Sequence, residues 1–135
     1  MVIWTENFTT GSSQLDQQHR MLIDHINRLE EMLTITNPTR EECEFMIELV
    51  DFLEDYAETH FKQEEQCMER FRCPSHQQNK VAHGRFLKFF RDFKEHYKAE
   101  GFRREILLNL HSTVSRWIEE HILHLDTQLK PFLQN

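Results

Sequence analysis

The chain has 135 residues, which suits one domain around a single buried core, and we predict one domain over residues 1–135. Its 16 Lys and Arg residues against 23 Asp and Glu residues give a net charge of −7, and the basic residues are scattered, which argues against nucleic acid or a membrane surface as a partner. The longest apolar runs are far shorter than the roughly 20 residues that span a bilayer, and the N-terminus lacks a secretion signal, so we expect a cytoplasmic protein.

Few helix breakers interrupt the chain. Only three Gly and three Pro occur, and most of them fall where a helix would begin or end, so they divide the chain into four long helical segments. We predict an N-terminal arm over residues 1–12, which contains Trp4 and Phe8, and a helical bundle over residues 13–135. No segment has the alternation of a β-strand, and the fold class is therefore predicted to be all-α.

The first helix is predicted to begin at Ser13 and to end near Thr36. Ser13 and Asp16 resemble a capping box with Asp in place of the usual Glu. The inward-facing residues then recur at spacings of three and four, the period of a bundle seam. They are Leu15, His19, Leu22, Ile26, Leu29 and Leu33.

The second helix is predicted to be capped by Asn37, with Pro38 in its first turn, and to end before Pro74. Its inward stripe comprises Met46, Leu49, Leu53, Tyr56, His60, Glu64, Cys67 and Phe71. The three cysteines are odd in number and none forms a Cys-x-x-Cys motif, so we expect free thiols and no zinc ribbon.

The third and fourth helices continue the same spacing, and Gly101 between them has the form of a glycine helix stop. The stripe of the third helix comprises Asn79, His83, Phe86, Phe90, Phe93 and Tyr97. The stripe of the fourth helix comprises Leu107, Leu110, Val114, Trp117 and His121. Short connections between long amphipathic helices favour antiparallel neighbours, so we predict an up-down-up-down four-helix bundle.

This topology brings histidines from all four helices to one end of the bundle. His19 and His83 lie near the starts of helices that run one way, whereas His60 and His121 lie in the later halves of helices that run the other way. A buried imidazole or carboxylate without a partner costs several kcal/mol, a cost that bound cations would remove. The pattern therefore indicates a shared metal site.

Two pairs of potential ligands differ in how well they suit a regular helix. His60 and Glu64 are four residues apart and face the same side, which permits one ion or a carboxylate that bridges two. Asp126 follows His121 by five residues and would lie about 140° around the helix from it. A bulge or an early end of the fourth helix is needed to bring the two together, and spacing alone favours His124 as the partner of His121.

Four segments together resemble the hemerythrin family, in particular the bacterial hemerythrins, and the resemblance runs from about Trp4 to Leu129. The segments are Leu15-Asp16-Gln17-Gln18-His19, His60-Phe61-x-x-Glu64-Glu65, His83-x-x-Phe86 and Trp117-Ile118-x-x-His121-Ile122-x-x-x-Asp126. Each segment is a weak signal by itself, but all four occur in the family's order.

The resemblance implies a non-haem di-iron centre that binds O2, with two carboxylates and an oxo or hydroxo group bridging the irons. Glu64 and Asp126 match the bridging carboxylates. The pair His19 and His60 matches the imidazoles of the iron that keeps an open position. The pair His83 and His121 matches imidazoles of the other iron. The resemblance also implies that small anions such as azide bind, and that the protein is not an enzyme.

The chain departs from the family pattern at Asn79, where the family has a further His four residues before His83. One iron would then have two imidazoles instead of three, unless Asn79 binds through its amide oxygen or another group substitutes. His76 lies two turns, roughly 10.5 Å, from His83 along the helix axis, and we expect it to be solvated. We expect an extra exchangeable iron position and fast oxidation of the diferrous form.

The other singled-out residues are expected to have supporting roles. Leu22, Ile26 and Trp117 are predicted to line the O2 pocket as well as the core, because a dry wall limits proton access. The remaining histidines fall beside or away from the stripes and are expected to be structural or solvated. They are His25, His96, His111 and His124.

Two functions fit this site. The altered ligand position favours an O2-sensing or redox-sensing module of a signalling protein, attached to an output domain. The length of the chain favours a free-standing protein for O2 storage or delivery. A ferritin-like oxidase is disfavoured because no Glu stands three residues before any of the nine His residues, and a zinc-binding or purely structural bundle is a minor alternative.

Overall fold

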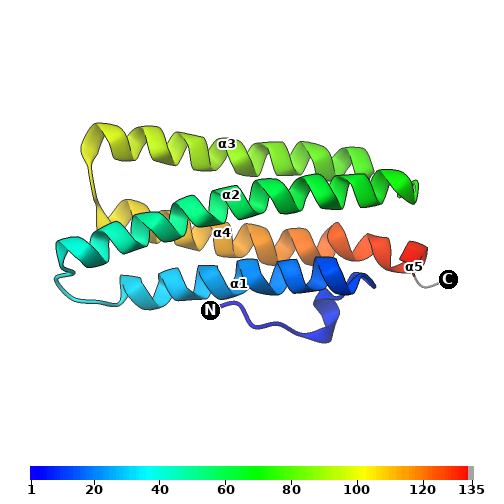
Figure 1. The fold of residues 1–135 in the computed structure, drawn as a ribbon, viewed down its shortest axis with the longest axis horizontal. Coiled ribbons are helices and arrows are strands. Elements are labelled where there is room, and N and C mark those ends of the chain that lie inside the picture. The colour runs from blue at the N-terminus through cyan, green and yellow to red at the C-terminus, as the bar shows by residue number, and fades with distance from the viewer. Residues whose placement is uncertain (134–135) are drawn as a thin grey trace.

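The protein is a bundle of four long antiparallel helices preceded by a short arm (Figure 1). The computed structural model describes residues 1–133, and the predicted end of the bundle at residue 135 lies outside that range. The elements are η1 (Glu6–Phe8), α1 (Ser13–Leu33), α2 (Arg40–Arg70), α3 (His76–Glu100), α4 (Arg104–His124), η2 (Asp126–Leu129) and α5 (Lys130–Leu133). Helix α1 packs against α2 and α4, and α2 packs against α3. The prediction of an all-α four-helix bundle is confirmed.

The first twelve residues fold back along the bundle and contribute to its core (Figure 1). Val2 is buried and forms two hydrogen bonds with the Asn27 side chain on α1, one donated at 3.0 Å and one accepted at 2.8 Å. Phe8 is also buried, and its ring stacks on Trp4 with centroids 5.5 Å apart. The arm is thereby fixed to α1, and its 3-10 turn contacts α4.

Helix α1 begins at Ser13 as predicted, but the capping residue is Ser12. The Ser12 hydroxyl accepts a hydrogen bond from the backbone N–H of Leu15 at 3.2 Å. The predicted capping box is wrong because Asp16 is engaged elsewhere: its Oδ1 accepts from both the backbone N–H and the hydroxyl of Thr10, each at 2.8 Å. The helix ends at Leu33, three residues before the predicted end.

Helix α2 is capped by Thr39, so the predicted cap at Asn37 and first-turn position of Pro38 are wrong. The Thr39 hydroxyl accepts from the N–H of Glu42 at 3.1 Å, and the Glu42 carboxylate accepts from the N–H of Thr39 at 2.9 Å. Asn37 has a φ of 53°, a left-handed conformation that belongs to the turn before the helix. The reciprocal capping box outcompetes the Asn-Pro pair.

Helices α2 and α3 end at the predicted breaks. The turn after α2 has Arg72 at a φ of 53°, and the N–H of Cys73 donates to the carbonyl of Met68 at 2.8 Å, a Schellman ending before Pro74. Gly101 ends α3 with a φ of 78°, and its N–H donates to the carbonyl of Tyr97 at 2.7 Å. Among residues 1–133, no helix is long and apolar enough to cross a membrane.

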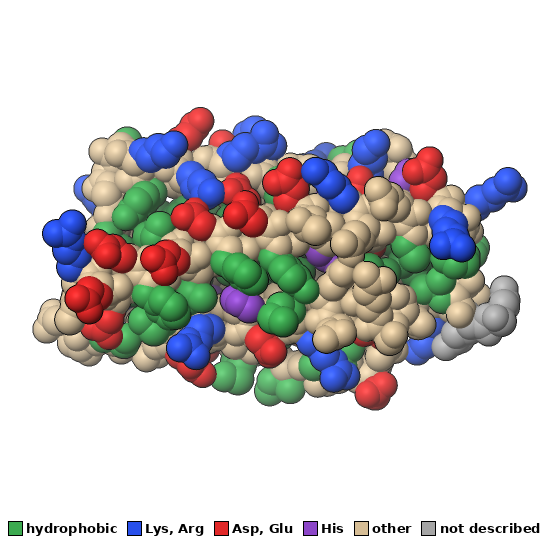
Figure 2. Space-filling view, viewed as in Figure 1, with side chains coloured by type: hydrophobic (Ala, Val, Ile, Leu, Met, Phe, Trp, Pro, Cys, Tyr) green, Lys and Arg blue, Asp and Glu red, His purple; other side chains and the backbone are tan. Residues whose placement is uncertain are grey.

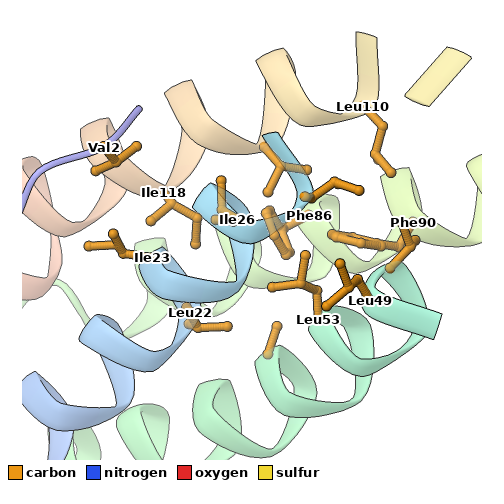
Figure 3. Close-up of a cluster of buried hydrophobic side chains, with 14 of the residues drawn as sticks. Val2, Leu22, Ile23, Ile26, Leu49, Leu53, Phe86, Phe90, Leu110 and Ile118 are labelled. Atoms are coloured by element: carbon orange, nitrogen blue, oxygen red, sulfur yellow. The ribbon is translucent and has the colours of Figure 1, made fainter. Parts of the chain in front are cut away.

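A continuous apolar core runs along the bundle, and its members Leu22 and Ile118 lie one turn from His19 and His121 (Figure 3). The predicted stripe of α2 is partly wrong, because Tyr56 and Cys67 are only half-buried and Phe71 is exposed. The buried face instead includes Ala57, Phe61 and Met68. A straight helix has 3.6 residues per turn, so a stripe with near-heptad spacing drifts around a helix as long as α2. In α4, Ile118 is fully buried and Trp117 only half-buried.

Candidate metal centre

All six residues predicted to bind metal meet inside the bundle, in the half where α1 and α3 begin and α2 and α4 end. They come from α1, α2, α3, α4 and η2, and every one of them is buried. They form two overlapping groups, in each of which the potential ligand atoms lie within 4.8 Å of one another. The groups are His19, His60, Glu64 and Asp126, and Glu64, His83, His121 and Asp126. We call them the first and the second ligand group.

Glu64 divides its two oxygens between the groups. Its Oε2 lies 3.0 Å from Nε2 of His19 and 3.3 Å from Nε2 of His60, whereas its Oε1 lies 3.0 Å from Nε2 of His83. The residue is completely buried because it lies on the inward face of α2, one turn after His60. A carboxylate in this position can bridge two ions.

Asp126 divides its oxygens in the same way. Its Oδ2 lies 3.1 Å from Nε2 of His19, and its Oδ1 lies 3.2 Å from Nε2 of His121. Of the two departures from a regular helix that this carboxylate would require, an early end of the fourth helix is the one found: α4 stops at His124, and the 3-10 helix η2 begins at Asp126 itself. The change of helix type turns this carboxylate inward, which a regular α-helix would not do, whereas His124 remains exposed.

The donor atoms converge in a way that suits cations. Nε2 of His83 and Nε2 of His121 are 3.1 Å apart, and both lie in the second ligand group. Asp126 Oδ1 is within 3.2 Å of His121 but not aligned for a hydrogen bond, so this buried oxygen has no hydrogen-bond partner. Imidazole and carboxylate ligands together suit iron and zinc. The residues present therefore fit a pair of such ions.

Glu64 and Asp126 strongly favour positive charge on the imidazoles around them. Burial lowers the pKa of His19, but hydrogen bonds and charge from Asp126 and Glu64 outweigh it and raise the pKa to about 10. Burial raises the pKa of Glu64, yet its contacts with His19, His60 and His83 hold it well below the usual value. Burial lowers the pKa of His60, and the carboxylates only partly oppose this. The two carboxylates thus stabilise a proton on His19 in the way that they would stabilise a cation.

The outward nitrogens of two imidazoles have partners that sequence reasoning missed. Nδ1 of His60 lies 2.6 Å from the amide oxygen of Gln18, and Nδ1 of His83 lies 2.9 Å from Oε2 of Glu65. Both partners directly adjoin a ligand residue in the sequence, but only the packing of α2 against α1 and α3 identifies their targets. Burial lowers the pKa of His83, but Glu64, Asp126 and Glu65 together raise it.

Asn79 lies beside the second ligand group and is fully buried. Its amide nitrogen donates to Glu64 Oε1 at 2.9 Å and contacts the sulfur of Met68 at 3.1 Å. Its amide oxygen is buried without a hydrogen-bond partner. His76 is half-buried at the start of α3 and belongs to neither group.

Aromatic and aliphatic side chains surround the site. Leu22 and Ile26 are each 1% exposed and lie in the core one and two turns after His19 (Figure 3). The Trp117 ring stacks on His121 with centroids 4.2 Å apart and planes at 11°. The Phe61 ring stacks on His83 at 3.9 Å and 5°. These contacts hold the two imidazoles of the second group in fixed planes.

One surface hollow borders the site, and a larger groove lies away from it. A hollow of about 320 Å³ borders His121 and includes Trp117 and Gln78, so it approaches the second ligand group from outside. Apolar side chains also reach the surface between α1 and α2 (Figure 2). They line a groove of about 500 Å³ that includes His25, Phe45 and Phe52 and none of the six candidate ligands. The six candidate ligands themselves are buried beneath the surface.

Comparisons with known proteins agree with this geometry. The family model described as the hemerythrin HHE cation binding domain matches residues 10–133. The chain is 28% identical to a bacteriohemerythrin of Clostridium acetobutylicum, over 95% of this chain and 98% of that one. It is 28% identical to a bacteriohemerythrin of Stenotrophomonas maltophilia, over 90% of this chain and 74% of that one.

Solved structures show the same fold. A crystal structure of wild-type hemerythrin superposes with a TM-score of 0.83, at 23% identity, over all of this chain and 99% of that one. The family match covers nearly the whole chain and includes both ligand groups. The chain therefore belongs to the hemerythrin family.

Proposed function

We propose that this protein binds two iron ions in the paired ligand groups and uses them to bind O2. The observation that carries the proposal is the division of Glu64 and Asp126, each of which presents one oxygen to either group. Shared carboxylates hold two ions close together, as cooperation on one small ligand requires. His19 and His60 would complete one iron site, and His83 and His121 the other.

Iron supplies the reversible redox chemistry and the open coordination positions that O2 binding requires, and the protein supplies everything around them. Glu64 and Asp126 neutralise the positive charge of the ions. Leu22, Ile26 and Trp117 keep bulk water and protons away from bound ligand, which slows irreversible oxidation. The hollow beside His121 supports entry of ligand from the α4 side.

We further propose that the iron of the second ligand group has an exchangeable position next to Asn79. The Asn79 amide nitrogen donates to Glu64 Oε1, so the side chain is used as a hydrogen-bond donor in this arrangement. In this arrangement the NH2 group faces the carboxylate, and an NH2 group cannot bind a cation. This supports Asn79 as a group that holds the bridging carboxylate, with two imidazoles left on that iron.

An open position on both irons favours a sensor of O2 or redox state over a store, because a more accessible centre oxidises and exchanges ligands more readily. The alternative is a free-standing O2 storage or delivery protein. The oxidation rate of the O2-loaded protein discriminates between them. Fast conversion to the diferric form supports sensing, whereas a long-lived O2 complex supports storage.

The test of the iron and O2 proposal is direct. The protein is loaded anaerobically with Fe(II), exposed to O2, and followed by metal analysis and visible absorption. Two irons per chain and oxo-to-iron charge-transfer bands after O2 are expected. Absence of bound iron, or iron without these bands, would refute the proposal.

The exchangeable position is tested by azide titration of the diferric protein and of the Asn79→His variant. The wild type should bind azide at both irons, and N79H at only one, because the added imidazole would fill the second position. Asn79→Leu serves as the matched control, since it removes the amide without adding a ligand. A single azide per di-iron unit in the wild type would contradict the open position.

A further inference from the structure

Two candidate ligand histidines have outer hydrogen-bond partners of different charge. Nδ1 of His60 meets the neutral amide oxygen of Gln18 at 2.6 Å, whereas Nδ1 of His83 meets the carboxylate of Glu65 at 2.9 Å. The first partner lies beside the first ligand group and the second beside the second ligand group. The two ion positions therefore differ in charge outside their immediate ligands.

Helix geometry explains how Glu65 reaches its partner. Glu64 points to the centre of the bundle, and Glu65 is rotated about 100° from it, toward α3 and His83. The Glu65 side chain is 20% exposed, so water screens its charge only in part. Because Phe61 stacks on the His83 ring at 3.9 Å, the ring cannot easily turn away from this carboxylate.

The contact also determines where the proton of His83 resides. A carboxylate at Nδ1 accepts an N–H there, which leaves Nε2 with a free lone pair. That nitrogen is the one that lies 3.0 Å from Glu64 Oε1, inside the second ligand group. A carboxylate partner also makes the imidazole more basic and hence a stronger metal ligand.

We propose that Glu65 is a positioning residue that selectively strengthens metal binding at the second ligand group. This inference rests on the proposed two-ion site. Asn79 contributes no imidazole to that group, and its amide nitrogen donates to Glu64 Oε1, the oxygen nearest His83. The extra negative charge of Glu65, delivered through His83, compensates for the ligand that the group lacks. Gln18 has no charge and provides no such compensation at His60.

The experiment titrates the metal-free protein anaerobically with Co(II), which binds without O2 chemistry, and measures both dissociation constants by calorimetry. Glu65→Ala should raise the dissociation constant of one of the two ions by about 10- to 100-fold and leave that of the other unchanged. Glu65→Gln keeps an acceptor but removes the charge, so it should weaken the same ion by a smaller factor. Glu69→Gln is the matched control, because it removes the same charge from an exposed position one turn later on α2.

Proton NMR of the Co(II)-loaded protein identifies the affected ion. Ring N–H protons of cobalt-bound histidines shift far from the normal range, and the N–H of His83 should move or vanish in Glu65→Ala and Glu65→Gln. Gln18→Ala should instead affect the N–H of His60 and weaken the other ion. These readouts separate positioning from general destabilisation, which would affect both ions.

The outcomes distinguish this inference from the proposed function. Fewer than two Co(II) ions in the wild type would overturn the two-ion site itself. Two ions in the wild type, with E65A or E65Q matching E69Q in both dissociation constants, would overturn the role of Glu65. Equal weakening of both ions in E65A would also overturn it.

Discussion

Removal of the metal ions should destabilise the protein, and the loss should concentrate at one end of the bundle. Six ionisable side chains converge there, with nitrogen and oxygen atoms as close as 3.0 Å. An ion that binds only the folded state contributes about 2.7 kcal/mol when its free concentration is 100 times Kd. Two ligand groups then contribute about 5 kcal/mol, which corresponds to a decrease in Tm of roughly 20 °C for a chain of this size.

Thermal unfolding by calorimetry, with the metal-loaded and the chelator-treated protein, measures this loss, and added Fe(II) should restore it under anaerobic conditions. Hydrogen exchange should show lost protection in the last turns of α2 and α4 and the first turns of α1 and α3. The opposite end should retain protection because its core is purely apolar. Its buried residues include Leu29, Leu33, Met46 and Leu107.

The matched control is the double variant His60→Ala, His83→Ala, which loses one ligand from each group. Chelator should change its Tm by no more than a few degrees, since it holds little metal. An unchanged Tm in the wild type after complete metal removal would refute the reasoning, and so would protection lost evenly along all four helices.

Three further predictions test separate parts of the structure. Ser12→Ala should lower the free energy of unfolding, measured in urea, by about 1 kcal/mol, because Ser12 caps α1. Ser13→Ala should change it little, and equal effects of the two substitutions would contradict this cap. Trp117→Ala removes the ring stacked on His121 and widens the adjoining hollow, so stopped-flow absorption should show faster oxidation of the O2-loaded protein; an unchanged rate would exclude Trp117 as a barrier. For the metal-free protein, the lowered pKa of Glu64 contributes stability that is present above its ordinary value of 4.5 and lost as pH falls through its folded-state value. The raised pKa of His19 contributes stability that is present below 6.5 and lost as pH rises through about 10. The free energy of urea unfolding should therefore have its maximum, from these two groups, between about pH 4.5 and 6.5. A maximum at alkaline pH would contradict this prediction.

The architecture could be predicted from the sequence because it depends on local signals. Long amphipathic segments separated by Pro74 and Gly101 permit few arrangements other than an antiparallel bundle. The antiparallel order in turn places His19, His60, His83 and His121 at one end without any knowledge of side-chain positions. The early end of α4 before Asp126 did not follow from spacing, which favoured His124; only the family resemblance indicated Asp126.

The parts that could not be predicted depend on competition between partners. Asp16 had two possible roles, and contact with Thr10 prevails over a capping box. The predicted inward stripe of α2 followed a near-heptad spacing, whereas the buried face follows the 3.6-residue period of a straight helix. Phe61 was therefore missed as a core residue.

Partners from other helices were equally out of reach of sequence reasoning. The donation from Asn79 to Glu64, and the contact of Glu65 with His83, require knowledge of how α2 and α3 face each other. A sequence pattern can indicate which residues share a stripe, but it cannot indicate which atoms of two stripes meet.

The most direct test of the central claim is Mössbauer and EPR spectroscopy of the protein loaded with two equivalents of iron and oxidised. If Glu64 and Asp126 bridge the ions, the two ferric ions should be antiferromagnetically coupled. Metal analysis should then give two irons per chain, Mössbauer spectra should show a diamagnetic ground state, and no EPR signal should appear. Isolated high-spin ferric signals from uncoupled iron, or a single iron per chain, would contradict a shared two-carboxylate centre.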